Sequence, residues 1–238
     1  MGCIWMLANL SDPAVLIITG IALSISTLSL YISHVFLPAK MKEAYLKSIT
    51  ALAAAVETKD SGTVGHAMRV AELAVSIAKK LGITGNELER IQYAALLRDI
   101  GKAIIPQAIL NKIEPLTPEE WKTVQKHSEL GAEMVRAVPF LANTADYIVH
   151  HHEYWDGTGY PDGQKGEGIP LGSRILAIAS DYDAMTSQRP YHPRALEPEE
   201  AVEEIRMDSG SKYDPTVVDA FLEVVNGHMT SLEKVKAA

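Results

Sequence analysis

The hydrophobic pattern separates a uniformly apolar N-terminal stretch from a long amphipathic remainder. No Asp, Glu, Lys or Arg occurs from Pro13 to Ala39. About 24 helical residues at about 1.5 Å each reach roughly 36 Å, more than a hydrocarbon core of about 30 Å. A buried soluble helix of this length would usually show a polar face, whereas this one carries only Ser, Thr and a late His34. The pattern predicts a transmembrane helix over residues 13–39, after a short extracytoplasmic N-terminus of residues 1–12.

The charges that flank this stretch indicate its orientation. Asp12 is the only charge before it, whereas three lysines follow soon after it: Lys40, Lys42 and Lys47. The positive-inside rule places the N-terminus outside and residues 40–238 in the cytoplasm, as in a single-pass protein of the inner or plasma membrane. A cleaved signal peptide fits less well, because residues 1–12 hold no Lys or Arg and the apolar run is too long.

Helical periodicity continues through the rest of the chain. It predicts a helical stalk over residues 40–58 and further helices over 64–81, 84–97, 118–136, 140–152, 173–187, 198–208 and 215–226. Thr84–Glu87 and Thr117–Glu120 have the spacing of capping boxes. No convincing run alternates in the manner of a strand. We therefore predict an all-α protein, with a globular domain over residues 59–228 and a tail over 229–238.

The composition limits the kinds of molecule that this protein can be expected to bind. The net charge of −8 argues against a protein that binds nucleic-acid polymers, so an anionic substrate would need a local cluster or a metal. The single cysteine, Cys3, rules out an internal disulfide, and a body without further cysteines suits a reducing cytoplasm. Gly20 and Ser24, like Ala22 and Ser26, have small-xxx-small spacing, which could support a homodimer through the span and stalk.

The segment from His151 to Pro161, HHEYWDGTGYP, is the strongest candidate for chemistry. Imidazole is the commonest protein ligand for transition metals. A loop rich in Gly and Pro can line the edge of a substrate-binding site next to such a metal. A polar helix end with a tight turn is the alternative reading. Further possible ligands occur elsewhere: His66 opens a predicted helix, Asp99 closes one, and His127 lies within the predicted helix 118–136. Side chains at the ends of different helices can converge on one crevice.

These motifs resemble the HD-GYP branch of the HD phosphohydrolases. The resemblance runs through Leu97–Lys102, His127, HHEYWDGTGYPDG, Asp183–Thr186 and Arg189–Tyr191, and covers most of residues 45–222. It implies an HD-type bundle of about seven helices with a buried cluster of metal ions. The implied activity is hydrolysis of cyclic di-GMP, or of a related cyclic dinucleotide.

The resemblance also implies roles for single residues. Asp99 would bridge two metals, His127, His151 and His152 would complete one site, and His66 would belong to the other. Asp99 and Lys102 are the candidate catalytic residues, with Lys102 facing the phosphate. The candidate substrate-binding residues are Arg98, Tyr160 and Arg189. Two metal ions can activate water and neutralise charge on a phosphodiester, and mixed imidazole and carboxylate ligation suits iron, manganese or zinc.

Two departures from the family pattern fall at the metal centre. Arg98 stands at the position of the HD histidine, so the pair is Arg98-Asp99, and Ser180 stands at that of a metal-binding aspartate. A guanidinium offers no lone pair to a metal. Asp181 points about 100° away around the helix and would need local distortion to substitute. The first site thus keeps only His66 and Asp99. We expect at most one ion, with slower chemistry than a two-metal enzyme, or no ion; two ions are the alternative.

Three hypotheses remain open from the sequence. The chain is a membrane-anchored phosphodiesterase with an impaired metal centre. Alternatively, it is a degenerate domain that binds the nucleotide, or a signalling partner through its Gly-Tyr-Pro loop, without turnover. Finally, it could be a dimerisation module whose metal residues are vestigial.

Overall fold

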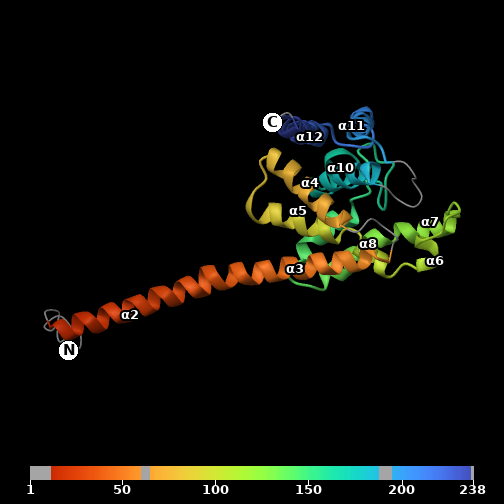
Figure 1. The fold of residues 1–238 in the computed structure, drawn as a ribbon. Coiled ribbons are helices and arrows are strands. Elements are labelled where there is room, and N and C mark those ends of the chain that lie inside the picture. The colour runs from red at the N-terminus through yellow and green to blue at the C-terminus, as the bar shows by residue number, and fades with distance from the viewer. Residues whose placement is uncertain (1–11, 60–64, 188–194, 237–238) are drawn as a thin grey trace. The chain divides into compact units, whose positions relative to one another are not determined.

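The computed structural model describes residues 12–59, 65–187 and 195–236, with side chains up to residue 227. Cys3 and Arg189, which the sequence singled out, lie outside the described residues. The chain divides into two compact units, Met1–Ser48 and Ile49–Ala238. Across the described residues the regular structure is helical, apart from one bridge between Ser209 and Tyr213. The predicted all-α class is confirmed (Figure 1).

From residue 12 onward the described part of the first unit is helical, and its last helix, α3, continues past Ser48 into the second unit. The Asp12 carboxylate accepts the N–H of Ala14 at 2.9 Å and caps α2, Pro13–Tyr31. A π-helical turn, Ile32–Phe36, leads into α3, Leu37–Glu57. Pro38 has no N–H to donate to the preceding turn, and a π turn is a common way for a helix to accommodate such a defect. From Pro13 to Glu57 the helix is long and apolar enough to cross a membrane by length and composition, with a mean hydropathy of 2.1 in its most apolar part.

The second unit is a helical bundle. Its α-helices are α4 (His66–Lys80), α5 (Gly85–Leu97), α6 (Gln107–Leu110), α7 (Pro118–Gln125), α8 (His127–Arg136), α9 (Ala145–Val149), α10 (Leu171–Thr186), α11 (Pro198–Met207) and α12 (Pro215–Lys236). Short 3₁₀ turns lie between them: η2 (Ile100–Ala103), η3 (Ala142–Thr144) and η4 (Gly166–Gly168). In this part of the described chain seven α-helices have eight residues or more, in agreement with the expected seven.

Helix α4 lies at the centre of the bundle, against α5, α10 and α12 (Figure 1). Its apolar residues recur at helical spacing, and Val70, Ala74 and Ile77 are fully buried. This packing holds the N-terminus of α4, which begins at His66, beside the end of α5, where Arg98 and Asp99 follow.

The histidines shorten two predicted helices. The predicted helix 118–136 is interrupted at Lys126, so His127 opens α8 instead of lying within a helix. The predicted helix 140–152 is only η3 and α9, and His150 to His152 lie in the turn that follows. His127 Nδ1 lies 2.7 Å from the carbonyl oxygen of Val124, and His151 Nδ1 lies 2.6 Å from that of Ile148. These imidazoles engage carbonyls of the preceding turn and so favour a helix end. At the other end of the chain, α12 continues to Lys236, past its predicted end.

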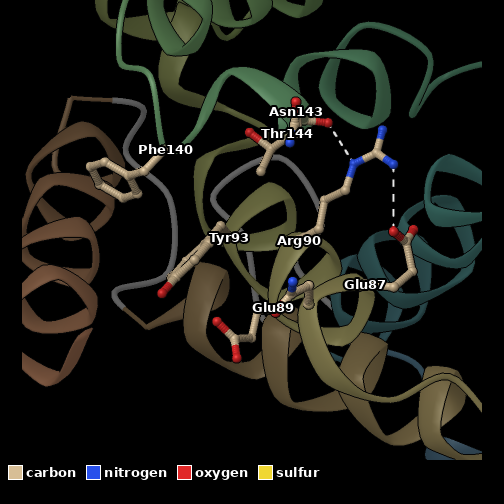
Figure 2. A pocket seen from close by; sticks show the side chains of 8 residues that line it. Glu87, Glu89, Arg90, Tyr93, Phe140, Asn143 and Thr144 are labelled. Atoms are coloured by element: carbon tan, nitrogen blue, oxygen red, sulfur yellow. Dashed lines mark hydrogen bonds and ion pairs between the residues drawn. The ribbon is translucent and has the colours of Figure 1, made fainter. Parts of the chain in front are cut away.

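One predicted capping box forms and the other does not. Thr117 and Glu120 exchange side-chain bonds to each other's backbone N–H at 3.2 and 2.8 Å, as predicted. The Thr84 side chain makes no capping bond to its helix, and the Glu87 carboxylate accepts the hydroxyl of Tyr147. Figure 2 shows Arg90, in a surface pocket, between Glu87 and the backbone carbonyl of Asn143, to which its Nε donates at 2.5 Å. These contacts fasten α5 to the segment that leads into α9, at whose end the adjacent histidines lie.

Candidate metal centre

Three histidines from two segments form a compact cluster. His127 opens α8, while His151 and His152 lie in the turn after α9. One ring nitrogen of each lies within 4.8 Å of one ring nitrogen of the others. Gly101 lets the turn η2 pack closely against the start of α8, because a Cβ at that position would overlap the carbonyl oxygen of His127.

Hydrogen bonds fix the orientation of two of the rings. Nδ1 of His127 and Nδ1 of His151 each face a backbone carbonyl, which makes these atoms the N–H donors and leaves Nε2 with its lone pair. His127 Nε2 is buried and has no hydrogen-bond partner within the described part of the chain. A buried acceptor without a partner is costly, and metal ligation is a usual explanation at such a cluster.

Burial keeps these imidazoles neutral. It lowers the pKa of His127, and together with the neighbouring His127 it lowers the pKa of His151 to about 3. Burial and His151 likewise hold the pKa of His152 well below its ordinary value. Neutral imidazoles are the form that binds metals, so this donor set fits a divalent transition metal.

Asp99 adjoins the cluster and supplies the negative charge. Its Oδ1 lies 3.7 Å from His127 Nε2 and 3.0 Å from Lys102 Nζ. Burial alone would raise the pKa of Asp99, but Lys102 and Arg98 outweigh that effect and hold its pKa well below the usual range. A metal would therefore share this carboxylate with two protein cations, which weakens its attraction for a further positive charge.

The guanidinium of Arg98 lies among the remaining residues of the first metal site. The side chain is 1% exposed. Its Nη2 donates to His66 Nε2 and lies 3.1 Å from Asp99 Oδ2, while its Nε donates to Ser180 Oγ at 3.3 Å. Nη1 donates to the carbonyl of Ala95 at 2.8 Å. The first site does not fit a metal ion, because a fixed cation already engages the atoms that would hold it.

His66 is held from its other side by residues whose role the sequence did not reveal. Its Nδ1 lies 2.5 Å from Asp183 Oδ2, and Arg69 binds the same carboxylate through Nε at 2.6 Å and Nη2 at 3.0 Å. The available signal was spacing, since Arg69 follows His66 by one helical turn. Asp181 is engaged by other residues: its Oδ2 accepts from the hydroxyl of Tyr213 at 2.9 Å and pairs with Lys212 at 2.8 Å.

The Gly-Tyr-Pro loop folds back onto the histidine pair. The ring of Tyr160 stacks on His152, with centroids 4.8 Å apart, and its backbone N–H donates to the carbonyl of His152 at 3.1 Å. A Cβ at Gly159 would overlap the backbone there, so the loop needs glycine. Glu153, 2% exposed, accepts the N–H groups of Asp162 and Gln164. This organising role of Glu153 was also missed from the sequence, where its only signal was a carboxylate next to two histidines.

The structure therefore brings together six of the residues singled out from the sequence: Asp99, Lys102, His127, His151, His152 and Tyr160. His66 and Arg98 lie outside the histidine cluster. Arg98 contacts both His66 and Asp99. Arg189 lies outside the described residues, and its role stays a prediction.

The sequence model of the HD domain family matches residues 50–217. The chain belongs to the HD domain family. Its fold agrees with a cyclic GMP-AMP specific phosphodiesterase of Vibrio cholerae, V-cGAP3, at a TM-score of 0.57 and 25% identity, over 75% of this chain and 48% of that one.

Curated relatives confirm the HD-GYP resemblance. A cyclic di-GMP phosphodiesterase of Thermotoga maritima is 43% identical over 171 residues, which are 71% of this chain and 46% of the relative. The cyclic di-GMP phosphodiesterase response regulator RpfG of Xanthomonas campestris is 36% identical over 185 residues, 77% of this chain and 49% of the relative. The HD domain chain thus spans about half the length of the curated relatives it matches.

Proposed function

We propose that this chain is a membrane-anchored, metal-dependent phosphodiesterase of the HD-GYP type that acts on cyclic di-GMP or a related cyclic dinucleotide, with a single metal ion. The observation that carries the proposal is the histidine cluster, with the lone pair of His127 Nε2 buried and facing its neighbours. The phosphodiesterase relatives supply the reaction class and the substrate class.

His127, His151, His152 and Asp99 would hold the ion. Iron, manganese or zinc would supply positive charge beside the phosphate and make water more acidic. Lys102 Nζ, 3.0 Å from Asp99, would donate to a phosphate oxygen. Tyr160, stacked on His152, would line the substrate side of the cluster, and Arg189 would bind phosphate through its guanidinium fork.

The single-ion form of the proposal rests on Arg98. Its guanidinium provides a permanent positive charge where a two-metal enzyme would hold its first ion. A guanidinium cannot acidify water as a metal does, so we expect slow turnover. Because Arg98 is buried and four protein groups accept from it or pair with it, we assign it a structural charge role ahead of direct substrate binding.

We propose that residues 13–39 span the membrane, with the N-terminus outside and the HD domain in the cytoplasm. The supporting observations are the exposed apolar side chains of α2, such as Leu23 at 68%, and the lysines that follow. Ser24 and Gly20 are open to a second span, which would allow a homodimer.

One observation favours a second candidate. Lys102 and Arg98 both pair with Asp99, so the site could bind a metal too weakly for catalysis. The domain would then bind the nucleotide, or a signalling protein at its Gly-Tyr-Pro loop, without turnover.

Metal content and turnover of the full chain in detergent separate the two. We expect close to one ion per chain, and slow conversion of cyclic di-GMP with manganese or iron. His151→Gln should abolish both, whereas His150→Gln is the matched control, because His150 bonds to Asp146 and Asp162 and not to the cluster. Binding of cyclic di-GMP without any product would establish the second candidate. Two tightly bound ions would refute the reading of Arg98.

A further inference from the structure

The end of helix α3 carries two opposite charges that reach different elements of the metal centre. Glu57 is the last residue of α3, and Lys59 follows it by two residues. The sequence there is Glu57-Thr58-Lys59. One side chain turns to the beginning of α4 and the other to the end of η2.

Glu57 caps α4 from outside that helix. Its Oε2 accepts the N–H of Gly65 at 2.8 Å, and its Oε1 accepts the N–H of Ala67. Gly65 has a left-handed φ of 88° and no side chain with which to cap. A carboxylate at a helix N-terminus satisfies free N–H groups and suits the helix dipole. Between these two bonds lies His66, whose ring contacts Arg98 and Asp183.

Lys59 caps η2 in the complementary way. Its ammonium donates to the carbonyl oxygens of Ala103 at 2.5 Å and Ile105 at 2.8 Å, and lies 3.4 Å from that of Lys102. A cation suits the carbonyl end of a helical turn. The backbone carbonyl of Lys59 is held in turn by Asn111 Nδ2 at 3.2 Å. The turn fixed in this way starts directly after Asp99.

We propose that Glu57 and Lys59 are positioning residues through which the end of α3 sets the geometry of the metal centre. Lys59 holds the turn that places Asp99 and Lys102, and Glu57 holds the helix start that places His66 against Arg98. The inference rests on the proposed function, since the site they position is the proposed single-metal site. Because Glu57 and Lys59 lie two residues apart at the end of α3, a displacement of that end acts on both elements at once.

The same helix offers a matched control. Glu43 and Lys47 are the same residue types on α3, paired with each other at 2.8 Å, with side chains 50% and 75% exposed. Their ion pairs, including that of Glu43 with Lys40 at 3.1 Å, stay within α3. Lys59→Met and Glu57→Gln are therefore compared with Lys47→Met and Glu43→Gln.

The test uses the full chain in detergent and cobalt(II), whose visible absorption reports its ligands and needs no turnover. Residues that orient metal ligands change metal affinity by about 10- to 100-fold when lost, and we expect about 10-fold weaker cobalt binding for Lys59→Met, with an altered spectrum. Lys59→Arg, which keeps the charge and the donors, should recover most of the affinity. The two control variants should bind cobalt as the unmodified chain does.

Amide hydrogen exchange keeps the two proposals separable. Lys59→Met should speed exchange at Ile104 and Ile105, and Glu57→Gln at Gly65 and Ala67, whether or not a metal binds. If the unmodified chain binds no cobalt, the proposed metal site fails and exchange alone decides the positioning role. If cobalt affinity, spectrum and exchange of Lys59→Met all match those of Lys47→Met, the positioning role is overturned.

Discussion

Replacing Arg98 with methionine tests whether a protein cation occupies the first metal position. Methionine fills much of the same volume without charge or donors. Any loss of stability therefore reflects the lost polar contacts and not a large cavity. The substitution leaves His66 Nε2 and the carbonyl of Ala95 without their donor, and it removes one of the two cations beside Asp99. The substitution removes the donor and leaves its acceptors unchanged, so buried polar groups lose a hydrogen bond and the folded state is destabilised.

The structure sets the size of the effect. Breaking a buried ionic network from one side costs about 3–5 kcal/mol, and the 1% exposure of Arg98 puts it in that class. For a chain of this length, 1 kcal/mol shifts the melting temperature by about 2–4 °C, so we expect a fall of about 6–20 °C. Arg69→Met is the control, because Arg69 also binds a carboxylate but its side chain is 42% exposed. Asp183 keeps its contacts with His66 and Ser187 in this variant, so the fall in melting temperature should be the smaller of the two.

Thermal unfolding of both variants, followed by tryptophan fluorescence in the same detergent, measures the difference. The reasoning fails if Arg98→Met melts within about 3 °C of the unmodified chain, the span of a typical surface change. It also fails if Arg69→Met is the more damaging of the two. Either result would mean that the guanidinium of Arg98 is not held by His66, Asp99 and Ser180.

Three further predictions concern the metal count, the pH dependence and the topology. Arg98→His combined with Ser180→Asp should raise the metal content from about one ion to two and speed turnover, whereas an unchanged ion count by elemental analysis would place the defect elsewhere. In the metal-free chain, the pKa of His151 is about 3 in the folded state, against 6.5 for an ordinary imidazole in the unfolded state. Between these two pH values only the unfolded state binds a proton at this residue. The unfolding free energy should therefore drop on acidification across that window, by up to about 1.4 kcal/mol per pH unit from this group, and equal slopes for His151→Gln in denaturant titrations would contradict it. Cys3, the only cysteine, should react with a membrane-impermeant maleimide on intact cells, with Cys3→Ser as the blank; labelling only after lysis would reverse the orientation.

Much of the fold followed from local patterns in the sequence. The periodicity located α4, α5, α10 and α11 to within about two residues of their bounds, because a continuous apolar face decides them. It failed at His127 and at the turn after α9. At both places an imidazole Nδ1 faces a backbone carbonyl of the preceding turn, and a pattern of apolar residues does not indicate such bonds.

The sequence indicated the grouping of His127, His151 and His152, but not the contacts around them. The loss of the first metal site stays a prediction. The 100° offset also indicated correctly that Asp181 points elsewhere. The position of the Arg98 guanidinium could not be predicted, because a long side chain can reach many places. The roles of Glu57 and Lys59 depend on partners up to 46 residues away in the sequence, beyond any local pattern.

The contact between Arg98 and Ser180 also has a consequence for how related sequences should vary. The hydroxyl of Ser180 lies 3.3 Å from Arg98 Nε, and an aspartate there would carry its oxygens one bond further toward the guanidinium. A histidine at 98 is shorter than arginine, so it would leave space at the first metal position, where a metal ion would need a carboxylate ligand. The two positions should therefore change as a pair, arginine with a small residue and histidine with aspartate. A chain with histidine at 98 and serine at 180 should be scarce, because it has neither the guanidinium nor the carboxylate at the first metal position.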